Sequence, residues 1–410
     1  MMENPASSTV SPHAAFRLGG DAREVLARPK PAGVADIRQR NLRAALQLVL
    51  SGNDRVTRAE IARTTGLTSA TVSSLLNELI DAGYVADGEM LESTGGKRPV
   101  ALHIDRSRFG ILVLLVRSSL LRAAVLDLTG VVVRQSEQTF TRPLTPEDVI
   151  AMARAAADSS PLSILTASVE IPGALEGDVV VESVQLGWQN VRVSALVSAE
   201  LDAPVFTVND ADAGALAEII NGPGPATDQI YVDVSDGIGA AIFEEGTLLG
   251  RSRTAGEIGH VCVDYSADAP LCNCGRRGCL EAFASVRSLL DLDRIEGMAP
   301  EELTVLAASD RARVKTARAA QELGKALSLL SSTLDIPHCV LGGFAYVLGS
   351  DFIAQLQREL DETRPRSARP ITVAYANPSD PFVGAGQYAI AALLGVRWPR
   401  REAHDLVSTR

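Results

Sequence analysis

The 410-residue sequence predicts a small winged helix-turn-helix head followed by a duplicated α/β body. Three short segments with helical apolar spacing and then a hairpin pattern occupy residues 41–103. From residue 108 the pattern changes to strands, and two successive blocks each combine a strand meander with crossover helices. Hydrophobic residues make up 46% and charged residues 22%, and no apolar run reaches the ~18 residues that a membrane span needs.

Residues 1–35 contain several prolines and serines and neither an apolar period nor the apolar core of a secretory signal. We therefore expect a disordered tail and a cytoplasmic protein, with the head at 36–105 and the body at 106–410. Residues 1–105 carry no net charge, whereas the remainder carries −11. Because an acidic body repels nucleic acid, any DNA contact should come from the head.

The head begins with a helix over residues 41–50, which the polar stretch at 51–54 ends. Thr57 and Glu60 have the spacing of a capping box, in which each side chain accepts from the other residue's backbone N–H. A second short helix is therefore expected to begin at this point and to stop near Gly66.

A third helix is expected to follow Thr68, because apolar residues recur from Val72 at i, i+3, i+4, i+7 and i+8. It should end at Gly83. Two strands, around a turn at residues 87–88 (Asp-Gly), then predict a hairpin that extends through residue 103.

The third helix offers short polar side chains away from its apolar stripe, and these suit base edges and phosphates in a major groove. The predicted DNA contacts are Ser69, Thr71, Ser73, Ser74 and Asn77 of this helix, with Lys97 and Arg98 of the hairpin. A winged helix-turn-helix that binds double-stranded DNA is the prediction. The alternative is a small helical domain whose third helix docks onto a protein partner.

The body should open with a three-strand meander at 109–116, 120–128 and 131–139, followed by a helix from Thr145 to about Ser159. Strands at 162–169 and 205–208 follow, each with a helical stretch. The second block has strands at 229–235, 239–243 and 247–250, then helices and a strand at 339–341. Two such blocks predict two lobes with a cleft between them.

Four metal-ligating residues stand close together: His260, Cys272, Cys274 and Cys279. Three thiolates and one imidazole fit a closed tetrahedral zinc site, which leaves no position for a catalytic water. The cluster therefore predicts a structural Zn²⁺ that fixes a loop. The alternative is a labile disulfide beside an unrelated histidine in the core.

The same region carries a longer pattern, GEIGH at 256–260 and CNCGRRGCLE at 272–281, which resembles the signature of the ROK family. Further pieces follow the family's order: PG at 172–173, VNDA at 208–211, DGIG at 236–239 and LGG at 341–343. The resemblance covers roughly residues 108–395, and the winged head ahead of it resembles the family's sugar-responsive repressors. It implies an actin-like body, that is, a duplicated ribonuclease H-like fold.

The resemblance also implies a sugar between the lobes. The residues that match the family's sugar ligands are Gly173, Asn209, Asp210, Glu257, His260 and Glu281. Carboxylates and an amide can each bind adjacent sugar hydroxyls, and a zinc-fixed loop would hold two of these groups in register. For Asp210 and Glu257 the alternative is ordinary helix capping or surface charge.

The sequence departs from the family's kinases where they open the domain with D-x-G-G-T. The equivalent residues are Leu115, Arg117, Ser118 and Ser119, so an acid is apolar and a glycine is a bulky arginine. Asp236 stands where a threonine is usual and adds negative charge near the expected phosphate position. We therefore expect poor ATP binding and no enzymatic activity.

The sequence as a whole predicts a DNA-binding transcription regulator, expected to be a repressor, whose body senses a sugar or sugar derivative. Its expected partners are operator DNA, the effector and a second copy in a homodimer or homotetramer, with no membrane. Two other functions stay open: an active sugar kinase with a DNA-binding head, and a DNA-binding protein that ignores ligands. A regulator that answers to a protein partner is a further alternative. The sugar, the operator and the regulated genes are not predicted.

Overall fold

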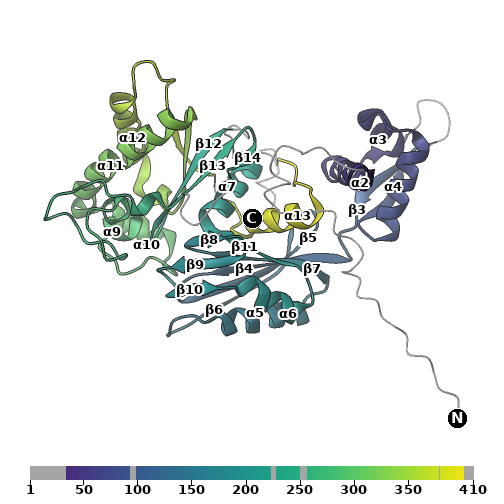
Figure 1. Ribbon diagram of the computed structural model, residues 1–410, viewed down its shortest axis with the longest axis horizontal. Helices are drawn as coiled ribbons and strands as arrows, with labels where there is room; N and C mark the ends of the chain where they lie inside the picture. Colours follow the sequence, from purple (N-terminus) through teal and green to yellow (C-terminus); the bar gives the residue numbers. More distant parts are fainter. Residues whose placement is uncertain (1–33, 93–97, 223–227, 250–255, 378, 401–410) are drawn as a thin grey trace, which may run out of the picture.

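The computed structural model describes residues 34–92, 98–222, 228–249, 256–377 and 379–400. Figure 1 shows a small head beside a larger body of two lobes, and the C-terminal helix lies between the two lobes. The predicted tail lies outside the described residues, except that its last two residues already belong to the first helix. Within the described part of the chain, no helix is both long and apolar enough to span a membrane.

The head contains the three predicted helices and a small antiparallel sheet of order β1-β3-β2. Its elements are α2 (Val34–Ser51), β1 (Val56–Thr57), α3 (Arg58–Thr65), α4 (Ser69–Asp81), β2 (Val85–Met90) and β3 (Val100–Ile104). The capping box is confirmed, because Thr57 accepts from the Glu60 N–H and Glu60 accepts from the Thr57 N–H. Gly66 ends α3 with a φ of 71°, which favours glycine.

The predicted turn at Asp87 and Gly88 is wrong. Both residues lie inside β2, where Asp87 pairs with Leu102 and the register shifts before Met90 pairs with Val100. A bulge of this kind accommodates an Asp-Gly step within an antiparallel strand. The connection between the two strands therefore comes later and includes residues 93–97. These residues, and with them the predicted DNA contact Lys97, lie outside the described residues.

The first lobe is built on a five-stranded sheet of order β11-β7-β4-β5-β6. Its elements are β4 (Phe109–Val116), β5 (Leu120–Asp127), β6 (Val132–Thr139), α5 (Pro146–Asp158), β7 (Ser163–Ile171), α6 (Val193–Leu201) and β11 (Val205–Asn209). Every residue of the central strand β4 is buried, as expected for a strand covered on both faces. A small sheet that the sequence pattern does not predict follows β7: β8 (Ala174–Glu176), β9 (Val179–Ser183) and β10 (Trp188–Val191).

The second lobe repeats this plan with the order β14-β13-β12-β15-β16. Its strands are β12 (Gln229–Val234), β13 (Ile238–Glu244), β14 (Thr247–Leu248), β15 (His338–Gly343) and β16 (Thr372–Tyr375). Its helices are η2 (Ile258–His260), α8 (Leu280–Ala284), α9 (Val286–Leu289), α10 (Pro300–Ala307), α11 (Asp310–Leu334), η3 (Ala345–Leu348) and α12 (Gly349–Thr363). In both sheets the first strand is central, its meander lies on one side and two parallel strands lie on the other. The predicted duplication is confirmed.

Two helices lie between the sheets (Figure 1). Helix α13 (Phe382–Leu394) packs with residues of β4, β7 and β11, whereas α7 (Asp210–Asn221) packs with residues of β12, β13 and β15. The two helices approach so closely that a β-carbon on Gly384 would lie 1.8 Å from the Ala213 carbonyl oxygen. The chain therefore crosses between the lobes twice, and the second crossing returns α13 to the first lobe.

The segment after α13 joins the head to both lobes. The Gln47 side chain of α2 donates to the Arg397 carbonyl at 2.8 Å and accepts from the Arg397 N–H at 2.7 Å. The Arg397 guanidinium donates to the Gly246 carbonyl, between β13 and β14, at 3.1 Å. Trp398 donates from its indole to the Leu128 carbonyl of the first lobe at 2.9 Å. The head is thus anchored by side chains and is not merely tethered by a linker.

Candidate functional site

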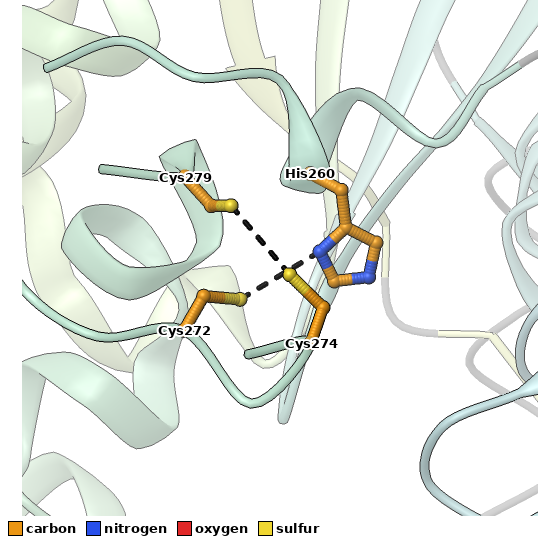
Figure 2. Close-up of side chains that lie close together, drawn as sticks. All are labelled: His260, Cys272, Cys274 and Cys279. Carbon is orange, nitrogen blue, oxygen red and sulfur yellow. Dashed lines mark hydrogen bonds between the residues drawn. The ribbon is translucent and has the colours of Figure 1, made fainter. Parts of the chain in front are cut away.

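Three cysteines and one histidine converge in the second lobe, as Figure 2 shows. We call His260, Cys272, Cys274 and Cys279 the metal cluster; their ligand atoms all lie within 4.8 Å of one another. The Cys274 and Cys279 sulfurs are 3.7 Å apart, and the Cys272 sulfur is 3.7 Å from His260 Nδ1. A zinc ion with ordinary bond lengths in a tetrahedron requires about 3.8 Å and about 3.6 Å for these two separations. The residues therefore fit a tetrahedral metal.

The disulfide alternative is wrong for the described residues, because all five cysteines are free and a disulfide requires an S–S distance of about 2.05 Å. The loop that carries the cluster is held by its own backbone. Cys272 donates its N–H to the Arg276 carbonyl at 2.8 Å, and a β-carbon on Gly278 would lie 1.8 Å from the Asp264 carbonyl oxygen. Burial raises the pKa of the Cys272 thiol well above its ordinary value, so the thiolate needs a cation beside it.

Two of the predicted sugar residues stand where β11 meets α7. Asn209 caps α7: its side-chain oxygen accepts from the Ala211 N–H at 2.9 Å, and its amide nitrogen donates to the Gly173 carbonyl at 2.9 Å. Asp210 also accepts from the Ala211 N–H at 2.9 Å. Helix capping was the alternative role for Asp210, but Asn209 is the main cap of α7.

The backbone conformation and the close packing at position 173 require a glycine. Its φ is 120°, and a β-carbon there would lie 2.4 Å from the Glu182 carbonyl oxygen of β9. The backbone of the small sheet therefore occupies the space that a side chain would need.

The two lobes touch close to these residues. Within the packing of α7 on the second sheet, a β-carbon on Gly239 of β13 would lie 3.3 Å from the Ala211 β-carbon. One on Gly237 would lie 2.9 Å from a Glu281 carboxylate oxygen and 3.4 Å from the Gln185 amide nitrogen of the first lobe. Side chains from both lobes thus meet around the 236–239 segment. Gln185 was not predicted, since its exposed position in a short hairpin carries no sequence signal.

Glu281 lies between this segment and the metal cluster. It is 7% exposed, accepts from the Ile238 N–H at 3.3 Å and from the Cys272 thiol at 3.6 Å. His260 turns Nδ1 toward the cluster, and Figure 2 shows its other ring nitrogen directed away from it. Glu257 precedes η2, is half-buried, and accepts the His260 N–H on its backbone carbonyl. One loop therefore supplies both cluster residues and predicted sugar residues.

Arg117 meets three acids at the lobe boundary: Glu170, which is buried, and Asp210 and Asp233, which are half-buried. Its guanidinium is 2.5 Å from Glu170 of β7, and it is also attracted by Asp210 and by Asp233 of β12. Burial lowers the pKa of Arg117, but the charge of the Glu170 carboxylate raises it, and the resulting pKa lies above the ordinary value. Burial raises the pKa of Glu170 to about 7, and burial and then Asp210 raise the pKa of Asp233 to about 6. The sequence did not point to Glu170 or Asp233, because a single acid in an apolar strand has no pattern.

The predicted DNA-binding face of the head is on the surface. Val72, Leu75, Leu76 and Leu79 are buried on one side of α4, whereas Ser69, Ser74 and Asn77 are exposed and Thr71 and Ser73 are half-buried. The hairpin of β2 and β3 forms the wing, and Arg98, which precedes β3, is exposed. Arg58 does not add free positive charge to this face, because its guanidinium pairs with Asp87 at 2.7 Å.

Comparisons with known proteins agree with the fold. The xylose repressor of Caldicellulosiruptor bescii is 28% identical over 358 residues, which cover 80% of this chain and 88% of that protein. A ROK family transcriptional regulator described as a homolog of the E. coli MLC protein has a TM-score of 0.73 at 19% identity, over 88% of this chain and 97% of that chain. A ROK glucokinase from Streptomyces griseus, in complex with glucose and AMPPNP, has a TM-score of 0.57 at 23% identity, over 68% and 99%.

Family models cover both parts of the chain. The MarR family model matches residues 42–89, which include α3 and α4 of the head. The ROK family model matches residues 119–390, more than half of the sequence and most of both lobes. The fold is accordingly a winged helix-turn-helix of MarR type followed by an actin-like ROK body, and the chain belongs to the ROK family.

Proposed function

We propose that this protein is a sugar-sensing transcription regulator, a repressor that binds operator DNA in the cytoplasm through α4 and its wing. The observation that carries the proposal is the anchoring of a MarR-type head onto a ROK body at Arg397, a residue that also contacts the second lobe. The relation to xylose repressors over most of the chain supports it. The parts proposed are the tail, which ends before α2 begins at Val34, the head, which continues to residue 105, and the two-lobed body from residue 106 onward.

The effector is proposed to lie between the lobes, against Gly173, Asn209, Asp210, Glu257, His260 and Glu281. The approach of Gln185 of the first lobe to Gly237 of the second supports this placement, since one ligand there would contact both halves. Xylose is the first sugar to test, because the relatives are named for it. Calorimetric titration of a sugar panel, xylose included, tests the site; heat from none of the sugars would favour a DNA-binding protein that ignores ligands.

A kinase is the second candidate, favoured by the structural likeness to a glucokinase. We propose that this chain does not transfer phosphate. Leu115 is buried at 2% exposure, and the side chain of Arg117 is directed to Glu170, where the family's kinases have an acid and a glycine. A coupled assay of ATP consumption over the same sugar panel is expected to show no sugar-dependent rate.

The DNA-binding surface can be tested with two kinds of variant. Replacing Lys97 and Arg98 together by alanine should weaken binding to all sequences and lower the slope of log K against log salt by up to about two. Asn77→Ala should change the base preference instead, because a bidentate base contact contributes about 1–3 kcal/mol of discrimination. Fluorescence anisotropy over a salt series measures both effects.

The matched control removes Arg311 and Lys315 of α11, two cations of the second lobe that pair with Asp291. This control should keep the wild-type salt slope. Identical salt series for wild type and the wing variant would show that the wing does not contact phosphate.

We also propose that the metal cluster holds a structural Zn²⁺ and that two copies associate, so that two heads read two half-sites. The bound zinc would fix the loop that carries Glu257, His260 and Glu281. It would supply no chemistry beyond this, because all four positions are filled by side chains. Sedimentation of the full chain measures the association.

A further inference from the structure

The turn between β4 and β5 holds a carboxylate that comes from the other lobe. Ser118 donates from its N–H at 2.9 Å and from its hydroxyl at 2.5 Å to one oxygen of Glu296. Ser119 donates from its N–H at 3.0 Å and from its hydroxyl at 3.2 Å to the other oxygen. Glu296 lies between α9 and α10 of the second lobe. Two successive residues of the first lobe therefore direct four hydrogen bonds to one carboxylate of the second.

This turn has the character of an anion-binding site. Successive backbone N–H groups that point the same way form a concavity for an anion, and here two hydroxyls reinforce them. The turn is closed by the Arg117 N–H, which donates to the Leu120 carbonyl at 2.9 Å. The Arg117 side chain bonds to Glu170 and its own strand, so no guanidinium bond to Glu296 contributes.

The segment that presents Glu296 is itself held in place. The neighbouring Ile295 is fully buried, and its N–H donates to the Asp236 carboxylate at 2.7 Å. The Asp236 carbonyl accepts from the Arg287 guanidinium at 3.0 Å. Asp236 is the residue that replaces the family's usual threonine. Here it fixes the backbone of the residue next to Glu296.

A tethered carboxylate suits this turn better than a free anion does. The Asp236 and Glu296 carboxylates repel each other, and Glu170, Asp210 and Asp233 all interact with Arg117, the residue that precedes Ser118. A phosphate group in solution, with about two negative charges, would be repelled by these acids. A carboxylate that belongs to the folded chain is delivered at a high effective concentration and adds only one charge.

We propose that Glu296 is a clasp between the lobes, a built-in anion that fills the turn at Ser118 and Ser119 and holds the second lobe against the first. Opening the lobes at this point then requires the loss of four hydrogen bonds to one carboxylate, and hydrogen bonds to charged acceptors are the stronger kind. The same contact keeps the turn closed to the phosphates of a nucleotide. The clasp goes beyond the proposed function and does not depend on which effector or operator the protein uses.

Hydrogen exchange of the full-length, zinc-loaded protein tests the clasp, because two of its four donors are backbone amides. In wild type, the Ser118 and Ser119 amides should be protected. In Glu296→Ala their exchange should be faster by roughly tenfold or more, since lost hydrogen bonds to a charged group lower the opening free energy. Glu296→Gln should give an intermediate rate, because its side chain keeps one acceptor oxygen. Glu302→Gln, an exposed acid of α10, is the matched control and should leave these amides unchanged.

Two results would overturn the clasp. The first is that, in wild type, the Ser118 and Ser119 amides exchange as fast as unprotected amides. This measurement does not depend on whether any variant folds. The other is unchanged protection in both Glu296 variants while exchange in β4 and β7 stays native. Neither measurement uses sugar or DNA. A failed clasp therefore leaves the proposed function standing, and a failed sugar titration leaves the clasp standing.

Discussion

Cys274→Ser is expected to lose its zinc, with an affinity more than about 100-fold below that of wild type. Changes to outer residues that merely support a ligand already cost about 10–100-fold, and here a direct ligand of a closed site is removed. Structural zinc sites bind with roughly 10–16 kcal/mol in zinc-finger peptides, and this energy is coupled to folding. The loop of residues 256–281 should therefore lose order, and the melting temperature should fall. Elemental analysis, which should give about one zinc per wild-type chain, and thermal unfolding measure the two effects.

Cys262→Ser is the matched control for this experiment. The Cys262 thiol lies beside the cluster but donates to the Asp264 carbonyl at 3.3 Å and does not belong to the four ligand residues. It should retain zinc and melt close to wild type. Finding no zinc in freshly purified wild type prepared without chelator would refute the metal proposal.

The correct sugar is expected to change operator affinity by roughly 5- to 150-fold, the usual range for coupling between two sites. A ligand shifts a conformational equilibrium only by its differential affinity for the two states, and a sugar that contacts Asp210 on one lobe and Glu257 on the other supplies such a difference. Asp210→Ala and Glu257→Ala should abolish the change while sugar-free DNA binding remains. Operator titrations with and without sugar measure this.

Arg397 allows loss of sugar binding to be separated from loss of transmission. Arg397→Met keeps both backbone hydrogen bonds to Gln47 and removes the guanidinium bond to Gly246 of the second lobe. We expect this variant to bind sugar and operator as wild type does, with a smaller effect of one on the other. Arg369→Met, which removes an exposed ion pair with the Asp335 carboxylate and a hydrogen bond to the Asp335 carbonyl, should behave as wild type. If wild type binds sugar by calorimetry but its operator titrations with and without sugar superimpose, the sensing hypothesis fails.

The sequence alone determined the elements whose signal is local. The capping box at Thr57 and Glu60 and the apolar stripe of α4 depend on residues a few positions apart, so their pattern was sufficient to place two helices of the head. The cysteine spacing within 272–279 likewise predicted the metal cluster, and the strand pattern predicted the repeated meander. The Asp-Gly step failed as a turn signal because a bulge in β2 absorbs it.

Only the tertiary structure decided what the isolated polar residues do. Glu170, Asp233, Gln185 and Glu296 carry no pattern in the sequence, because each acts through a partner that lies far away along the chain. Arg117 appeared in the sequence only as the loss of a glycine, yet in the fold it pairs with Glu170 at the lobe boundary. Ser118 and Ser119 likewise became donors to Glu296 only when the second lobe folded against the first. Hydrogen bonds and charge pairs form between neighbours in space, and sequence periodicity reports only neighbours along one element.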